Sequence, residues 1–292
     1  MAQVRDALMP AAVWRDRAEA HRARLEGMIG GYLALRRAGR AHPVEDFLFT
    51  YYGHRPGRLM AWHPGAGVVL EGAKAAEFGM AYADTPDGAT LDLDALLPKR
   101  AKALAWTRDL LAATAARPAH LGCFGMHEWA MVYKLGQDEI RHAAWPLRLP
   151  PEEVAEVVDR RGVRCSHFDA FRFFTPPARP LNVLQPTREG QREQEQPGCL
   201  HANMDLYKWA YKLSPMIPAE LVADCFALAR EIRAVDMRAS PYDMAALGHP
   251  PIRVETAEGR AEYAAFQRSF AERAEPLRAA LVAHCDRLLA LL

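Results

Sequence analysis

The sequence AELVADCFALAREIRAVD, residues 219–236, decides the fold class of this chain. Its apolar residues recur at the three- and four-residue spacing that gathers side chains on one face of an α-helix. They are Leu221, Val222, Cys225, Phe226, Leu228, Ala229 and Ile232. A helix with such a face is held in place mainly by packing of that face against the rest of the protein. We therefore expect this helix to lie in the core of a helical fold.

Three further segments predict helices. Residues 14–37 combine an approximate apolar stripe with many Arg and Glu residues, which is typical of a surface helix. Residues 99–116 are rich in Ala and Leu and should form a helix that ends before Pro118. Residues 259–292 should be mostly helical, with a break near Pro276.

Short strands are expected in two places. Turn-forming residues are frequent between residues 53 and 98, which is typical of short strands joined by turns. Residues 68–70 are the expected strand in this region. In RCSHFDAFRFF, residues 164–174, polar and apolar side chains alternate as in a strand or an extended segment. The residues that such a strand would place on one face are Cys165, His167, Asp169 and Phe171, with Arg172 as the nearest partner for the aspartate. We expect one mainly α domain over residues 1–292 with a few short strands, and an α+β fold is the alternative.

Composition limits the class of protein. With 292 residues, of which 50% are hydrophobic, the chain can bury a sizeable core. Its 37 basic and 36 acidic residues nearly cancel, so no overall charge attracts it to nucleic acid or to an anionic membrane. No apolar run approaches the roughly 20 residues that span a bilayer, and no protein partner is indicated. Five cysteines without a CxxC motif do not suggest a disulfide framework, so we expect a reducing, cytoplasmic location.

Residues able to perform chemistry are concentrated in three segments, 120–145, 164–182 and 197–213. Each segment combines a Cys and a His at short spacing with a carboxylate and aromatic rings. They are Cys123, His127, Glu128 and Trp129; Cys165, His167, Asp169 and Phe171; and Cys199, His201, Asp205 and Tyr207. A pocket built from all three segments would be acidic, rich in imidazole and lined by flat rings.

Local structure is predicted around the third segment. LQPTREGQREQEQPG, residues 184–198, is nearly devoid of apolar residues and should form a long exposed loop, either a lid or a linker. We then expect a strand or turn over residues 198–202 and a helix over residues 204–213. Asn203 is the expected N-cap. Asp205 would lie in the first turn, where the helix dipole stabilises an ionised carboxylate.

Two kinds of chemistry fit these residues. In the first, either Cys and His pairs or His and carboxylate side chains hold a zinc or iron ion. The candidate histidine ligands are His127, His142, His167 and His201. The Cys and His spacings match no standard zinc module, and an HExxH motif is excluded because position 131 is Met131. In the second, Asp169 or Asp205 stabilises an oxocarbenium-like transition state while rings stack on a base, as cleavage of an N-glycosidic bond requires.

Five strings along the chain are long enough to be specific to one protein family. They are HPVEDFLFTYY (42–52), GCFGMHEWAMVYK (122–134), CSHFDAFRFFTP (165–176), EQPGCLHANMDLYKWAYKL (195–213) and DMRASPYD (236–243). Together they resemble a bacterial family, frequent in actinobacteria, that usually carries the name 3-methyladenine DNA glycosylase. The resemblance extends from about His42 to the C-terminal helix and implies cleavage of an N-glycosidic bond. LYKWAYKL and DMRASPYD are also similar to strings in the queuosine-nucleotide salvage glycosidases, which implies a free nucleotide as substrate.

The residues and the resemblance together favour an N-glycosidase that needs no cofactor and releases a modified purine from DNA or a nucleotide. The expected catalytic residues are Asp169, Asp205, Glu128, His127, His167 and His201. Of these, the aspartates would stabilise the transition state, Glu128 or His127 would assist the departing base, and the other histidines would orient groups or share protons. The expected substrate-binding residues are Trp129, Phe171, Arg172, Asn203, Tyr207, Lys208, Trp209, Asp236 and Arg238. The alternatives are a zinc- or iron-dependent enzyme and a non-catalytic nucleotide-binding protein.

Overall fold

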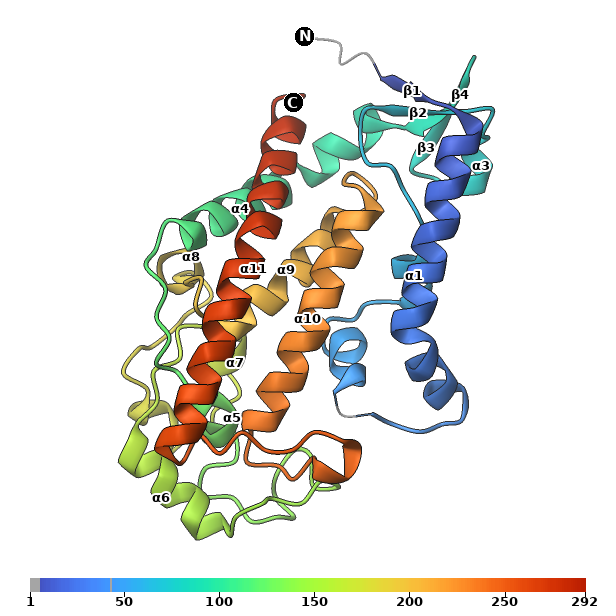
Figure 1. Ribbon diagram of the computed structural model, residues 1–292. Helices are drawn as coiled ribbons and strands as arrows, with labels where there is room; N and C mark the ends of the chain where they lie inside the picture. Colours follow the sequence, from blue (N-terminus) through green and yellow to red (C-terminus); the bar gives the residue numbers. More distant parts are fainter. Residues whose placement is uncertain (1–5, 43) are drawn as a thin grey trace. The chain divides into compact units, whose positions relative to one another are not determined.

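The computed structural model describes residues 6–42 and 44–292, and Figure 1 shows its helices and strands. The fold is mainly α-helical, with 57% of the chain in helices and 7% in strands, which confirms the expected fold class. The chain divides into two compact units. Unit 1 contains the described residues up to Leu111 together with Leu206–Ala229 and Leu277–Leu292, and unit 2 contains Ala112–Asp205 and Arg230–Pro276. The expectation of a single domain stays a prediction.

The helices confirm most of the predicted ones. The α-helices are α1 (Ala11–Arg37), α2 (Pro56–Met60), α3 (Ala75–Phe78), α4 (Leu93–Ala115), α5 (Met126–Ala130), α6 (Pro151–Arg161), α7 (Phe168–Phe171), α8 (Gln191–Gln194), α9 (Leu200–Leu213), α10 (Ala219–Ala239) and α11 (Ala257–Leu289). The predicted break near Pro276 is wrong, because α11 continues through it. Ala274 and Leu281, on either side of the proline, are both fully buried, so packing holds both halves of the helix. None of the helices described is long and apolar enough to cross a membrane.

Unit 1 contains a small sheet with the strand order β1-β2-β4-β3. The strands are β1 (Ala7–Met9), β2 (Val68–Glu71), β3 (Tyr82–Thr85) and β4 (Gly88–Leu91). β1 is parallel to β2, and β4 is antiparallel to β2 and β3, so β2 confirms the strand expected at residues 68–70. Trp14 of α1 shares a buried apolar cluster with Leu70 and Tyr82. Gly88 is required in β4 because a Cβ atom there would lie 1.9 Å from the Leu70 carbonyl oxygen.

The strand predicted over residues 164–174 is wrong. The chain is extended up to His167, whose carbonyl then accepts the N–H groups of Ala170 and Phe171 and begins the single helical turn α7. The side chain of Asn182, rather than a neighbouring strand, bonds the N–H and the carbonyl of Cys165. The alternation in the sequence therefore does not place Asp169 and Phe171 on one strand face with His167.

The exposed loop predicted over residues 184–198 is also wrong in part. Gln191, Glu195 and Gln196 are buried, and residues around Gln191 form α8. Several of their polar groups are bonded inside the protein: Gln191 donates to the Glu195 carboxylate, and the Gln196 side-chain oxygen accepts the backbone N–H groups of His120 and Gly198. Part of a segment nearly devoid of apolar residues is thus buried with the help of hydrogen bonds.

The helix predicted to begin after Asn203 begins at Leu200 instead. Asn203 lies inside α9, where its side chain donates to the Pro197 carbonyl at 2.9 Å, so the N-cap prediction is wrong. Asp205 consequently lies beyond the first turn, and the expected stabilisation by the helix dipole does not apply. The earlier start places His201 and Asp205 four residues apart on one helix, and hence on the same face.

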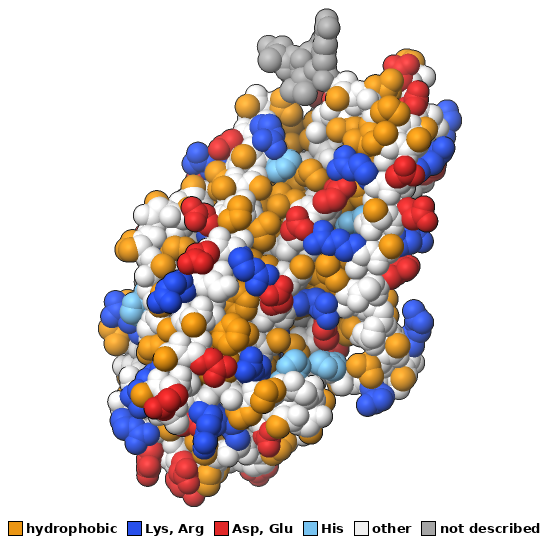
Figure 2. All heavy atoms as spheres, in the orientation of Figure 1, with side chains coloured by type: hydrophobic (Ala, Val, Ile, Leu, Met, Phe, Trp, Pro, Cys, Tyr) orange, Lys and Arg blue, Asp and Glu red, His pale blue; other side chains and the backbone are white. Residues whose placement is uncertain are grey.

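The charged residues on the face that Figure 2 shows are of both signs. On the face that Figure 2 shows, Lys and Arg side chains alternate with Asp and Glu side chains. This distribution agrees with the near-zero net charge of the sequence.

Candidate functional site

The candidate site lies in unit 2 and begins at α5, which is anchored on the C-terminal end of α10. The chain enters α5 through Phe124 and Gly125, which both have a positive φ. A Cβ atom on Gly125 would lie 3.3 Å from the Cβ of Ala239, so glycine permits the close approach. Trp129 then donates from Nε1 to the Ala239 carbonyl at 2.9 Å. These contacts hold His127 of α5 close to the last turns of α10.

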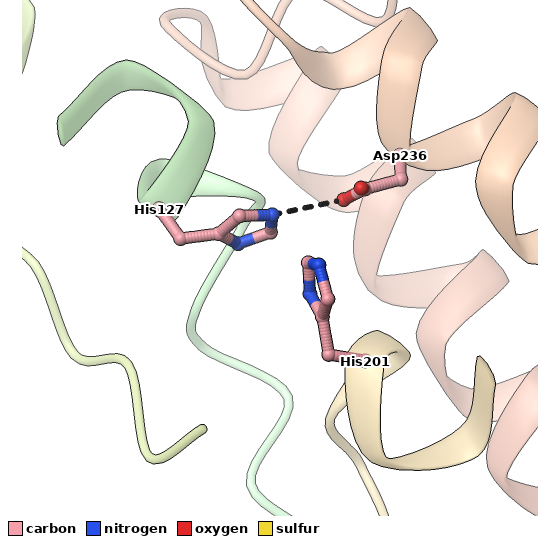
Figure 3. Close-up of side chains that lie close together, drawn as sticks. All are labelled: His127, His201 and Asp236. Atoms are coloured by element: carbon pink, nitrogen blue, oxygen red, sulfur yellow. Dashed lines mark ion pairs between the residues drawn. The ribbon is translucent and has the colours of Figure 1, made fainter. Parts of the chain in front are cut away.

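The first cluster at the site, the first triad, consists of His127, His201 and Asp236. Their side chains point towards one another from α5, α9 and α10 (Figure 3). One possible ligand atom from each residue lies within 4.8 Å of the others, and all three residues are buried. Nε2 of His127 lies 3.2 Å from Oδ1 of Asp236. The ring centroids of His127 and His201 are 4.4 Å apart.

The second triad consists of His167, Glu195 and Asp205. Nε2 of His167 lies 3.4 Å from Oε1 of Glu195 and 3.3 Å from Oδ2 of Asp205. All three residues are buried, and Gln191 donates a hydrogen bond that orients the Glu195 carboxylate. The two triads are neighbours, because the His167 ring lies 5.3 Å from the ring of His201. Helix α9 thus supplies one residue to each triad.

A buried arginine balances the charge of the first triad. NH1 of Arg233 lies 3.1 Å from Oδ2 of Asp236 and 3.2 Å from Oε1 of Glu128. Its side chain is only 4% exposed. Arg233 and Asp236 are three residues apart on α10, so the helix itself brings the cation to the carboxylate.

Burial and neighbouring charges shift the pKa values of the first triad in different directions. Burial, followed by the charge of His127, lowers the pKa of His201 well below its usual value. Burial also acts to lower the pKa of His127, but the carboxylates of Asp236 and Glu128 more than offset it and raise that pKa. Burial acts to raise the pKa of Asp236, yet the charges of His127 and Arg233 hold it below its usual value. The triad therefore favours an ionised Asp236 beside a neutral His201.

The cysteines of the three segments do not belong to the triads: Cys165 and Cys199 are buried, and Cys123 is partly buried. Burial raises the pKa of Cys165 to about 12 and that of Cys199 well above its usual value. Burial also raises the pKa of Cys123, whose Sγ accepts a hydrogen bond from Gln267. The described residues that could together hold a metal ion are His and carboxylate residues, without cysteine.

Among the expected catalytic residues, the structure brings together His127, His201, His167 and Asp205, with Glu128 joined through Arg233. Asp169 lies apart on α7, where it pairs with Arg172 at 3.5 Å and with Arg188 at 3.1 Å. The candidate ligand His142 is exposed and belongs to neither triad.

The expected substrate-binding residues are scattered. In unit 2, Trp129 is fully buried, Phe171 is half-buried on α7, and Arg238 pairs with Glu262. Asp236 belongs to the first triad instead of forming a separate substrate contact. Also in unit 2, Arg172 pairs with Asp169 and Asn203 lies inside α9. Tyr207, Lys208 and Trp209 lie in unit 1, where Tyr207 packs against His54 and Phe226 and Trp209 packs against Trp106.

Sequence reasoning missed Glu195 and Arg233. Arg233 and Asp236 continue the helical spacing of Phe226 and Ala229. That spacing could have indicated a buried ion pair at the end of the apolar stripe. Glu195 had no such signal, because its segment is uniformly polar.

Comparison of the chain with protein-family models, with curated proteins and with solved structures gave no match. The function therefore has to be argued from the chemistry of the two triads.

Proposed function

We propose that this protein is a metal-dependent enzyme whose first and second triads each hold a zinc or iron ion. The observation that supports it best concerns Nε2 of His127 and Oδ1 of Asp236. The two atoms are buried and face each other as an ion pair at 3.2 Å, and neither has a further hydrogen-bond partner among the described residues. An imidazole nitrogen and a carboxylate oxygen that are buried together without another partner are donors that a metal ion could join.

One separation in the first triad and two in the second are compatible with ligands on a common ion. Two donors that each bind one ion at about 2.1 Å lie roughly 3.0 to 3.4 Å apart at octahedral or tetrahedral angles. The distance in the first triad is 3.2 Å, and the distances from Nε2 of His167 in the second are 3.3 and 3.4 Å. Imidazole and carboxylate donors together suit zinc and iron. When bound, such ions act as Lewis acids that polarise an oxygen atom or activate water.

Surrounding residues position the proposed ligands. Arg233 bonds Oδ2 of Asp236 and so leaves Oδ1 directed at the histidines. Gln191 donates to Oε1 of Glu195, the oxygen that faces His167, and so holds that oxygen in position. Contacts of this kind behind the ligands orient them and tune the affinity for metal.

The test is metal analysis by inductively coupled plasma mass spectrometry of the full chain purified without a metal-affinity tag. We expect up to two zinc or iron ions per chain, with a loss of about half in His201→Asn. Asp169→Asn, which removes a carboxylate outside both triads, should retain the metal. A folded chain that contains no such metal, and takes up neither Zn²⁺ nor Fe²⁺ on dialysis, would overturn the proposal.

Cleavage of an N-glycosidic bond is a second candidate, favoured by the pairing of Asp205 with His167. The Asp205 carboxylate lies 3.3 Å from Nε2 of His167 and is almost completely buried, which suits a carboxylate that moves a proton through an imidazole. Release of base from alkylated DNA and from modified purine nucleotides should be measured with and without EDTA. Turnover that survives removal of metal, and is lost in Asp205→Asn, would favour the carboxylate mechanism over the metal-dependent one.

A further inference from the structure

Unit 2 contains a cavity of about 340 Å³ whose wall is basic. This volume lies within the range of small-molecule sites, about 300 to 1,000 Å³. Its wall includes Arg161, Arg164 and Arg260, and none of the described residues that line it is acidic. Three cations without a counter-charge in the wall distinguish this cavity from the mixed charge of the surface.

The arginines of the cavity lack the carboxylate partners that other arginines of unit 2 have. Arg161 donates to the backbone carbonyl of Glu255, and Arg260 donates to the same carbonyl and to that of Val254. Carbonyl oxygens orient a guanidinium group but do not neutralise it. By contrast, Arg273 binds both oxygens of the Glu231 carboxylate at 2.7 Å.

Arg164 is the most available of these cations. Its side chain is exposed, and within residues 6–42 and 44–292 it forms no ion pair. Burial, followed by the charges of Arg260 and Arg160, lowers the pKa of Arg161, and the charge contribution is that expected of neighbouring cations.

The rest of the wall suits an apolar group. Phe124, Val163 and Val254 line the cavity together with glycines. Phe124 has φ 45°, a left-handed conformation that is uncommon for a residue with a side chain. A ligand here would place a flat or apolar part against these residues and its charge against the guanidinium groups.

The cavity is adjacent to the first triad. A smaller cavity, large enough for about one water molecule, is lined by His127 and His201. The two cavities share Cys123 and Arg164 in their walls. A ligand bound in the larger cavity would therefore lie next to the first triad.

We propose that this cavity binds a small organic phosphate, with the phosphate on Arg161, Arg164 and Arg260 and the organic part against Phe124. Three guanidinium groups match a doubly charged phosphate better than a singly charged carboxylate, and arginine binds phosphate through paired hydrogen bonds. Binding itself is independent of the proposed function. The further step, that this ligand is the substrate of the metal-dependent enzyme, rests on the proposed function.

The test is isothermal titration calorimetry of the full chain with phenyl phosphate, with benzoate and inorganic phosphate as comparison ligands. It is run on protein as purified and after EDTA treatment, because phosphate also binds metal ions. We expect phenyl phosphate to bind more tightly than either comparison ligand in both preparations. Arg164→Gln should weaken binding about tenfold or more, as expected for loss of a charge-assisted hydrogen bond. Arg273→Gln, a matched change outside the cavity, should not weaken it.

Different results would rule out the phosphate site and the metal-dependent enzyme. Equal binding by wild type and Arg164→Gln, or no binding of phenyl phosphate, would overturn the phosphate site whatever the metal content. His201→Asn should lose metal and still bind phenyl phosphate after EDTA treatment. If a chain that takes up no metal still binds phenyl phosphate, the phosphate site is supported and the metal-dependent enzyme is ruled out.

Discussion

Substitution of Asp236 by Asn should destabilise the metal-free protein by about 3 kcal/mol, because it breaks a buried ion pair. Asp236 is fully buried, its partner Arg233 is 4% exposed, and the two groups are 3.1 Å apart. At that distance Coulomb attraction is worth roughly 5 kcal/mol with an effective dielectric constant of 20. Glu128 still faces Arg233 at 3.2 Å in the variant, so part of the attraction remains.

Asp169→Asn is the matched control for this prediction. It removes the same charge from a carboxylate that also lies 3.1 Å from an arginine, but that arginine, Arg188, has a side chain that is 56% exposed. Exposed pairs contribute about 0 to 1 kcal/mol. The free energies of unfolding should be measured by urea denaturation of EDTA-treated proteins. A loss below about 1 kcal/mol in Asp236→Asn, or equal losses in both variants, would refute the reasoning from burial.

Three further predictions concern other features of the molecule. Removal of metal by EDTA should lower the free energy of unfolding by about 3 kcal/mol if the ion was present at 100 times its dissociation constant. In differential scanning calorimetry, EDTA should shift the melting temperature of His201→Asn less than that of the wild type. Burial, followed by the charge of Arg58, lowers the pKa of His63 to about 4. Between about pH 6.5 and about pH 4 the unfolded state therefore binds a proton that the folded state does not, so the free energy of unfolding should fall by roughly 2 kcal/mol over that range. In urea titrations, the free energy of unfolding of His63→Gln should depend less on pH. Gly88→Ala should cost about 3 kcal/mol because its Cβ would lie 1.9 Å from a carbonyl oxygen, whereas Gly72→Ala, at a positive φ with no atom within 4 Å, should cost about 1 kcal/mol in the same assay.

The helical framework could be predicted because its signal is local. The spacing of Phe226, Ala229 and Ile232 along α10 reports which face is buried, and that face is set by the geometry of one helix. The strand predicted around Asp169 failed because alternation over a few residues does not require a strand. A strand needs a partner for its backbone groups, and the side chain of Asn182 takes that place at Cys165.

Several residues of the site could be predicted from the sequence, but their pairing could not. The sequence by itself determined that Arg233 and Asp236 lie one turn apart, and that histidines and carboxylates are concentrated in three segments. It did not determine that Glu195 is buried, because a polar segment is buried only when other parts of the chain satisfy its hydrogen bonds. Only the tertiary structure decided which His faces which carboxylate, since that pairing depends on contacts between segments far apart in the chain.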